Sequence, residues 1–261
     1  MSDEVLYETR DHTAILTLNR PQALNSVNQA LATAVGEAVE RAASDEQVRV
    51  VVLTGSGDRA FCAGMDLKAF AAGENAAPDG HPEWGFGGFT RHRIDKPTIA
   101  AVNGAAFGGG AELVLACDLA IAGRSARIAF PEVTRGLVAG AGGVVRLQRQ
   151  IPRKLALEAL LTGAPMTADR ALDLGLLNRV VDDDAVLTEA LALAAVIAAN
   201  APLAVQATKA FVRDSDRFGS DWDDDVWQQN EATVMPIFTT EDAREGAVAF
   251  AEKRRPVWRG R

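Results

Sequence analysis

The sequence predicts an α/β core followed by an α-helical C-terminal region. Two patterns indicate this fold class. In the first half of the chain, short apolar segments rich in β-branched residues alternate with amphipathic segments of helical period. Beyond Gly140, almost every segment has helical period. We therefore expect a core at residues 1–200 and a helical region at residues 201–261, a division that suits a chain of 261 residues.

The N-terminal half contains the first strands and the first helix. Residues 13–18, 48–54 and 97–103 are short apolar runs, and the last two suit buried strands of a parallel sheet. Residues 73–89 hold glycines and prolines without a period and predict a long mobile loop, a kind of segment that often acts as a lid. A helix ending near residue 43 is predicted by five apolar residues at helical spacing: Leu24, Val27, Leu31, Val35 and Val39.

The rest of the chain is mostly helical. A helix is expected from Gly109 through Leu115, followed by two short strands at residues 119–122 and 127–130. We find no internal repeat of fixed period. Seven further helices are expected at residues 144–150, 154–161, 168–174, 185–199, 203–214, 222–234 and 241–252.

Composition and charge exclude several classes of protein. The chain is 48% hydrophobic and 24% charged, as is ordinary for a globular protein, and its net charge is −8. The negative charge argues against bulk nucleic-acid binding and against a membrane-surface protein. No apolar run reaches the roughly 18 to 20 residues that span a bilayer. The acidic start of the chain does not resemble a secretory signal, so a cytoplasmic protein is expected.

Cysteine and histidine usage argues against disulfide, zinc and cysteine-nucleophile chemistry. Cys62 and Cys117 lie in apolar surroundings and are expected to be buried free thiols. The three histidines are dispersed without the spacing of a zinc site. No histidine lies near Cys62 in sequence to activate it. Neither a G-x-S-x-G elbow nor a G-x-x-x-x-G-K-[ST] loop is present.

Two glycine-rich segments could bind an anionic group. Residues 55–60 fit G-x-G-x-x-A, but the segment that follows has loop character, which favours a plain turn over a dinucleotide site. Residues 104–112 are more informative, because a strand leads into three successive glycines that open a helix. Backbone N–H groups at such a helix start can hold an anion or a developing oxyanion. The alternative is that these glycines only allow close helix–strand packing.

Glu112 and Glu132 are the candidate acid and base. Taken alone, Glu112 could be a capping residue in the first turn of its helix, and Glu132 could be an exposed loop carboxylate. If the fold brings them together in a dry pocket, their pKa values separate, so that one donates a proton while the other accepts.

Three stretches together resemble the crotonase, or enoyl-CoA hydratase/isomerase, superfamily. They are residues 60–67 (AFCAGMDL), residues 96–113 (KPTIAAVNGAAFGGGAEL) and residues 130–143 (FPEVTRGLVAGAGG). Further matches run from Leu18-Asn19-Arg20-Pro21 to residues 250–254, so the resemblance covers nearly the whole chain. It implies a crotonase-like spiral of ββα turns with an α-helical C-terminal region used in trimerisation.

The resemblance also assigns roles to residues. It implies that backbone N–H groups of Ala63 and Gly109 form an oxyanion hole for a thioester carbonyl. Glu112 would activate water, Glu132 would protonate the α carbon, and Gly140 would lie near the attacking water. No cofactor or metal is implied beyond coenzyme A (CoA), which is part of the substrate. The CoA would be bound by Arg20, Ala23, Leu24, Ala63, Gly64, Met65, Asp66, Leu67 and Gly109, with Phe250 and Lys253 reaching the CoA of a neighbouring subunit.

The implied activity is hydration of 2-enoyl-CoA to 3-hydroxyacyl-CoA, as in fatty-acid β-oxidation, by a homotrimer or a dimer of trimers. Ala105 and Ala139 replace residues common in hydratases, and the loop at 73–89 resembles that of crotonobetainyl-CoA hydratases. A specialised hydratase of that kind or a Δ3-Δ2 enoyl-CoA isomerase is therefore the alternative. A non-catalytic acyl-CoA- or RNA-binding relative and a serine-protease relative are the more distant possibilities. Neither nucleic acid nor membrane is an expected partner.

Overall fold

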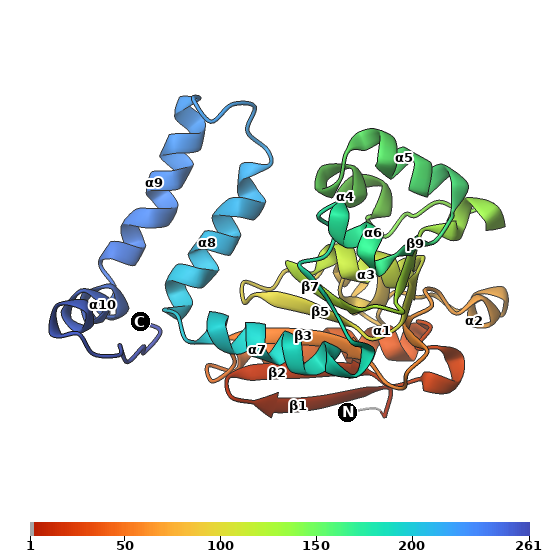
Figure 1. Ribbon diagram of the computed structural model, residues 1–261, viewed down its shortest axis with the longest axis horizontal. Helices are drawn as coiled ribbons and strands as arrows, with labels where there is room; N and C mark the ends of the chain where they lie inside the picture. The colour runs from red at the N-terminus through yellow and green to blue at the C-terminus, as the bar shows by residue number, and fades with distance from the viewer. Residues whose placement is uncertain (1–2) are drawn as a thin grey trace.

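Two β-sheets form the core of the computed structural model, which describes residues 3–261 (Figure 1). The larger sheet has the order β1-β2-β3-β5-β7-β10 and the smaller one β4-β6-β8-β9. All strand pairs are parallel except β1–β2 and β8–β9. The strands are β1 (Val5–Arg10), β2 (Thr13–Leu18), β3 (Val50–Gly55), β4 (Ala60–Cys62), β5 (Thr98–Val102), β6 (Ala105–Phe107), β7 (Leu119–Gly123), β8 (Arg127–Ala129), β9 (Met166–Thr167) and β10 (Arg179–Val181).

The chain passes from one sheet to the other in a repeated unit. Strand β3 leads to β4 and a helix, β5 leads to β6 and a helix, and β7 leads to β8 and further helices. Each unit therefore places one strand in each sheet before a helix returns the chain. This arrangement confirms the expected ββα spiral with α-helices after the strands. The helices of the core are α1 (Gln29–Ser44), α2 (Leu67–Ala71), α3 (Gly109–Ala116), α4 (Gly143–Gln150), α5 (Arg153–Thr162), α6 (Ala168–Asp173) and α7 (Val186–Ala198).

The central strands of the larger sheet are buried on both faces. Helix α1 buries Leu31, Val35 and Val39 in the cluster that contains one face of the sheet. Helix α7 covers the opposite face, where Ala190 and Ala194 pack in a second cluster with residues of β3, β5 and β7. Every residue of β3 is consequently buried, as its continuous apolar run predicts.

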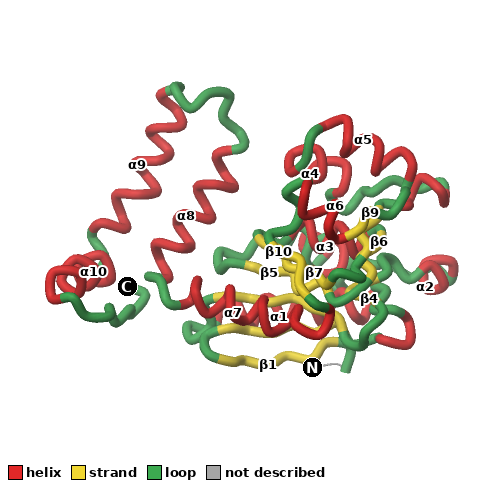
Figure 2. Tube along the Cα trace, in the orientation of Figure 1, coloured by secondary structure: helices red, strands yellow, loops and turns green. Residues whose placement is uncertain are grey.

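The C-terminal helices extend away from this core. Helices α8 (Pro202–Ser215), α9 (Asp224–Phe238) and α10 (Glu241–Glu252) form the blue arm of Figure 1 and the separate group of red coils in Figure 2. Within α8 and α9 no residue is buried. All seven helices expected beyond Gly140 are present, and the helical C-terminal region is confirmed. The domain boundary at residue 200 stays a prediction.

Several elements differ from the sequence expectation. Strand β1 was not expected, because most of its residues are exposed or half-buried and its pattern is polar. Helix α1 begins at Gln29 instead of near Leu24, since the side chain of Asn28 caps it by accepting a hydrogen bond from the N–H of Leu31. The residues before this cap form a turn, and Val27 pairs with Met65 in an isolated parallel bridge.

The second half of the glycine-rich loop packs on α1 and does not have the open character expected of a mobile lid. A Cβ atom added to Gly88 would lie 2.1 Å from the carbonyl oxygen of Ala32. The indole ring of Trp84 similarly occupies the space beside Gly36. Tight contact with a helix backbone leaves this segment little freedom to move, so the expectation is corrected for residues 84–88.

Cys62 and Cys117 are both free and buried, as expected. Between residues 3 and 261, no single helix has the length and apolar character needed to cross a membrane. The bent pair Asp183–Ala198 and Pro202–Ser215, whose axes differ by 106°, passes the same test only when the two are combined.

Candidate active site

A tight contact between two loops forms the floor of the site. Gly64 follows β4 and has a φ of +91°, a conformation that side-chain-bearing residues rarely adopt. A Cβ atom at Gly64 would lie 2.6 Å from the carbonyl oxygen of Phe107 and 3.1 Å from the nitrogen of Gly109. Only glycine therefore allows the loop after β4 to approach the start of α3 this closely.

The loop after β4 offers one free N–H group, and it is not the expected one. The N–H of Ala63 donates to the carbonyl oxygen of Leu24 at 3.0 Å, so Ala63 cannot supply an oxyanion donor in this conformation. The bridge to Val27 uses the carbonyl of Gly64 and the N–H of Asp66, at 2.8 and 2.9 Å. Met65 therefore faces away from Val27, and its N–H makes no hydrogen bond within residues 3–261. Sequence reasoning missed this donor because the bridge that sets its direction joins distant segments.

The second N–H donor is at the start of α3. Gly109 is the first residue of this helix, and the first helical hydrogen bond runs from the N–H of Glu112 to the carbonyl oxygen of Gly108. The N–H groups of a first helical turn have no partner within their own helix, and the helix dipole adds positive potential there. Gly109 thus lies at the helix start beside Gly64, and its expected role as an oxyanion donor stays a prediction.

Glu112 is buried in the first turn of α3, with only 3% of its surface exposed. Its Oε1 accepts a hydrogen bond of 2.8 Å from the N–H of Gly143, at the start of α4. The carboxylate therefore binds a second helix and does not cap its own. Burial, the largest cause, and the nearby charge of Glu132 together raise the pKa of Glu112 to about 7, against the opposing hydrogen bond from Gly143.

Glu132 lies on the other side of Gly108, in a 3₁₀ turn, Pro131–Arg135. Its Oε1 is 3.2 Å from the position that a Cβ atom of Gly108 would occupy. Its Oε2 is buried and has no hydrogen-bond partner among the described residues. Burial raises the pKa of this carboxyl group as well, and the charge of Arg135 partly opposes the increase.

The two carboxyl groups lie around one apolar wall. Glu132 lines a cavity of about 270 Å³ together with Phe130, Val138 and Ala139. Glu112 is not part of that lining, but it lies directly behind it: the Cβ position of Gly143 is 3.1 Å from Glu112 Oε1, 2.7 Å from Ala139 Cβ and 3.3 Å from the ring of Phe130. Two neighbouring carboxyl groups, both with raised pKa values, are the arrangement that an acid/base pair requires.

Gly140 immediately follows this wall. Its N–H donates to the carbonyl oxygen of Val138 at 2.7 Å, and the residue is exposed. The structure therefore places Gly140 in the loop that carries Ala139, next to the cavity of Glu132.

Most of the residues expected to bind CoA, at positions 20–24 and 63–67, lie in two adjoining segments around Arg20 and Asp66. The Arg20 guanidinium contacts the carboxylate of Asp66 at 3.0 Å and that of Glu4 at 3.3 Å, so its role here is to join the two segments. Asp66 also caps α2. Burial alone would raise the pKa of Asp66, but hydrogen bonds from Ala69 and Arg20 outweigh it and lower the pKa. Leu24 has a φ of 54°, which is unusual for a branched side chain, and with Ala23 it borders this region.

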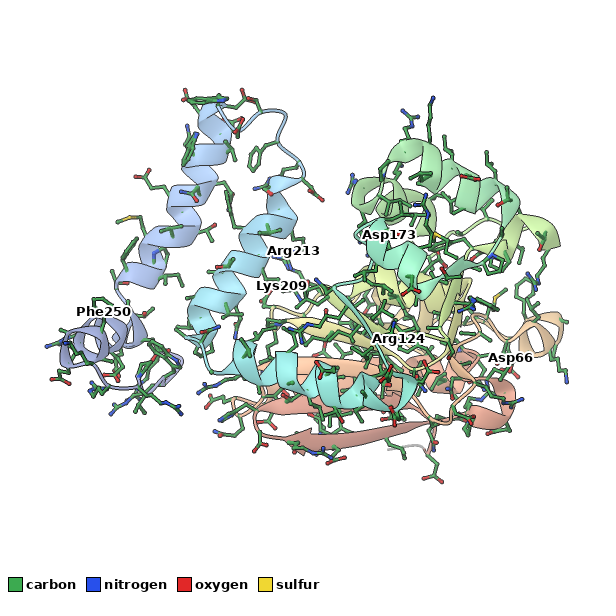
Figure 3. The ribbon with its side chains drawn as sticks, viewed as in Figure 1. Asp66, Arg124, Asp173, Lys209, Arg213 and Phe250 are labelled. Carbon is green, nitrogen blue, oxygen red and sulfur yellow. The ribbon has the colours of Figure 1, made fainter. Side chains whose placement is uncertain are left out.

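Phe250 and Lys253 lie far from these segments. Both are on the C-terminal arm, where 88% of Phe250 is exposed. Figure 3 shows Phe250 and Asp66 at opposite ends of the molecule. One chain therefore does not bring Phe250 and Lys253 to its own CoA segments, and their role stays a prediction about a neighbouring subunit. Within residues 3–261, no three His, Cys, Asp or Glu side chains are placed to hold a metal ion.

The raised pKa of Glu112 predicts a pH-dependent cost to folding. Since the folded state binds this proton more tightly than the unfolded chain, the contribution of Glu112 to stability is highest below its ordinary pKa of 4.5 and falls as the pH rises to about 7. Glu112→Gln removes the titration. We expect the unfolding free energy of the variant, relative to the wild type, to increase by about 3 kcal/mol between pH 4.5 and pH 8, measured by urea denaturation.

Glu158→Gln is the matched control, because Glu158 is exposed on α5 and its side chain makes no hydrogen bond or ion pair with residues 3–261. The difference in unfolding free energy between Glu158→Gln and the wild type should stay constant between pH 4.5 and pH 8. A constant difference for Glu112→Gln as well would contradict the prediction.

The comparisons with known proteins agree with this geometry. A family model described as enoyl-CoA hydratase/isomerase matches residues 8–261. The chain belongs to the enoyl-CoA hydratase/isomerase family. It is thus an enzyme of a family that includes hydro-lyases, and the family assignment from its sequence is confirmed. Its crotonase-like fold is confirmed by the same comparisons.

The relatives of this chain include proteins named for carnitinyl-CoA and proteins named enoyl-CoA hydratase. The carnitinyl-CoA dehydratase of Proteus mirabilis is 41% identical over 100% of both chains. Among solved structures, an enoyl-CoA hydratase from Mycobacterium tuberculosis is 46% identical with a TM-score of 0.94 over 100% of both chains. A carnitinyl-CoA hydratase from Mycobacterium avium is 51% identical with a TM-score of 0.79, also over 100% of both chains.

Proposed function

We propose that this enzyme adds water to 2-enoyl-CoA thioesters to give 3-hydroxyacyl-CoA, as in the β-oxidation of fatty acids. The observation that carries the proposal is the pair of close carboxyl groups, Glu112 and Glu132, beside two loops that present the N–H groups of Met65 and Gly109. Two carboxyl groups with raised pKa values at one site suit a reaction that needs both a proton acceptor and a proton donor, as hydration does.

The reaction follows from these groups. The carboxylate of Glu112 takes a proton from water as the water oxygen bonds to the β carbon. Electrons of the double bond move toward the thioester oxygen, where the N–H groups of Met65 and Gly109 stabilise the negative charge. The protonated carboxyl of Glu132 then gives its proton to the α carbon. A pKa of about 7 suits Glu112 for proton transfer near neutral pH, and burial raises the pKa of Glu132 as well. The division into base and acid follows the family resemblance.

A direct assay tests the proposal. Purified enzyme with crotonyl-CoA should remove the ultraviolet absorbance of the conjugated enoyl thioester, and 3-hydroxybutyryl-CoA should form in equal amount. If no enoyl-CoA loses absorbance while a 3-enoyl-CoA gains it, the enzyme is an isomerase and hydration is rejected.

A second acyl group is favoured by the relatives. Because proteins 41% and 51% identical to this chain are named for carnitinyl-CoA, we propose crotonobetainyl-CoA as the alternative substrate. The same absorbance assay, run with crotonyl-CoA and crotonobetainyl-CoA at equal concentration, separates the two. A ratio of kcat/KM that favours crotonobetainyl-CoA would assign the specialised function.

We also propose that the enzyme is a homotrimer or a dimer of trimers. Support comes from the C-terminal arm, where large apolar side chains are exposed beyond what a solvated helix needs. Analytical ultracentrifugation of the purified chain would test this, and a monomer at micromolar concentration would contradict it. The exposed residues are Val212, Trp222, Trp227, Met235, Phe238 and Phe250.

A further inference from the structure

An aromatic ring from the glycine-rich loop lies against Gly109, a residue of the proposed oxyanion hole. A Cβ atom added to Gly109 would be 2.3 Å from both Cε1 and Cζ of Phe86. The ring therefore rests against the backbone of the residue whose N–H is proposed to bind the thioester oxygen. A ring this close to Gly109 is within reach of an acyl group whose thioester oxygen binds there.

Trp84 fixes the segment that carries Phe86. Its indole ring is stacked between two imidazoles, with ring centroids 3.9 Å from His81 and 4.4 Å from His92 and interplanar angles of 4° and 10°. The far edge of the indole fills the space beside Gly36 of α1, where a Cβ atom would be 2.2 Å from the ring. Trp84 is thus held on both faces and at one edge.

Further contacts hold this stack on the core. Nε2 of His92 contacts a carboxylate oxygen of Glu40 on α1 at 2.8 Å, and its Nδ1 contacts the carbonyl oxygen of Gly88 at 3.0 Å. The N–H of Arg91 donates to the carbonyl oxygen of Trp84 at 3.0 Å, which closes the segment into a compact turn. Phe86 follows Trp84 by two residues within this turn, so the contacts of Trp84, His92 and Gly88 fix the backbone from which its ring reaches Gly109.

We propose that Phe86 determines acyl specificity by limiting the width of the acyl group beside the thioester, and that Trp84 positions Phe86. The inference rests on the proposed function. It implies that straight-chain enoyl groups such as crotonyl are preferred over enoyl groups branched at the α carbon. A flat, rigid ring suits this role, because a more flexible side chain would move aside for a branched acyl group.

The test is the ratio of kcat/KM for tiglyl-CoA, which carries an α-methyl branch, to that for crotonyl-CoA. Phe86→Ala is expected to raise this ratio by about tenfold or more, the scale of one methyl group in an apolar pocket. Trp84→Ala should raise it in the same direction by a smaller factor, and Trp84→Phe should restore most of the wild-type ratio. A role in stability alone would lower both activities together and leave the ratio unchanged.

Phe70→Ala is the matched control. Phe70 is half exposed on α2, near the segments expected to bind CoA, so its loss should affect both substrates alike. Phe86→Leu, a smaller change, provides the same readout if Phe86→Ala does not fold. An unchanged ratio in a folded Phe86 variant, or a wild type that prefers tiglyl-CoA, overturns the inference. Failure of the wild type to hydrate any enoyl-CoA would reject the proposed function instead.

Discussion

Glu112→Gln is expected to lower kcat for crotonyl-CoA hydration by about a hundred- to ten-thousand-fold, the contribution of a positioned acid or base. Glutamine keeps the shape of the side chain, and its carbonyl oxygen can still accept the hydrogen bond from Gly143. It cannot take a proton from water. The loss should therefore appear in kcat, with KM changed little, because substrate binding does not depend on the lost proton transfer. Steady-state kinetics over a range of crotonyl-CoA concentrations would measure both parameters.

Glu132→Gln should reduce kcat by a similar factor, because the reaction loses its proton donor. The double variant should lose far less than the product of the two single losses, since the two groups act in one proton-transfer cycle. Glu158→Gln, with its carboxylate exposed on α5, should keep wild-type activity. Near-wild-type kcat in either folded single variant of the pair would remove the basis of the proposed reaction.

Gly64→Ala is expected to reduce kcat/KM by about a hundred- to a thousand-fold, the effect of removing one oxyanion donor. The added methyl group would lie 2.6 Å from the carbonyl oxygen of Phe107, and this backbone atom cannot move away as a side chain could. The loop must therefore shift, and the N–H of Met65 shifts with it away from Gly109.

Gly73→Ala separates this collision from backbone strain. Gly73 has a φ of +88°, close to the +91° of Gly64, but a Cβ atom there would meet nothing within 4 Å. Both variants should lose about 1 to 2 kcal/mol of stability from an unfavourable φ. Only Gly64→Ala should lose activity. Equal activity of the two variants would show that the position of the Met65 N–H does not matter for the reaction.

Most regular elements were predictable from the sequence because their signals are local. The continuous apolar run of β3 and the helical spacing of the seven helices beyond Gly140 each depend on residues close together in the chain. Strands β4 and β6 were not predictable in this way, since each has only three residues and adjoins a glycine-containing segment that reads as a loop. They exist because neighbouring strands of the smaller sheet pair with them. The packing of the loop around Trp84 was likewise not predictable, because its partner α1 is distant in the sequence.

The sequence by itself determined the family and the ββα order, and it proposed Glu112, Glu132 and Gly109 as site residues, because these depend on residue types in a fixed order along the chain. Tertiary structure alone decided which N–H on the loop after β4 is free. In the bridge between Val27 and Met65, the Asp66 N–H bonds to Val27, and the N–H of Met65 points away. Tertiary structure also decided that Phe86 rests on Gly109. Hydrogen-bond direction and ring position arise from contacts between distant segments, and local sequence patterns carry no record of them.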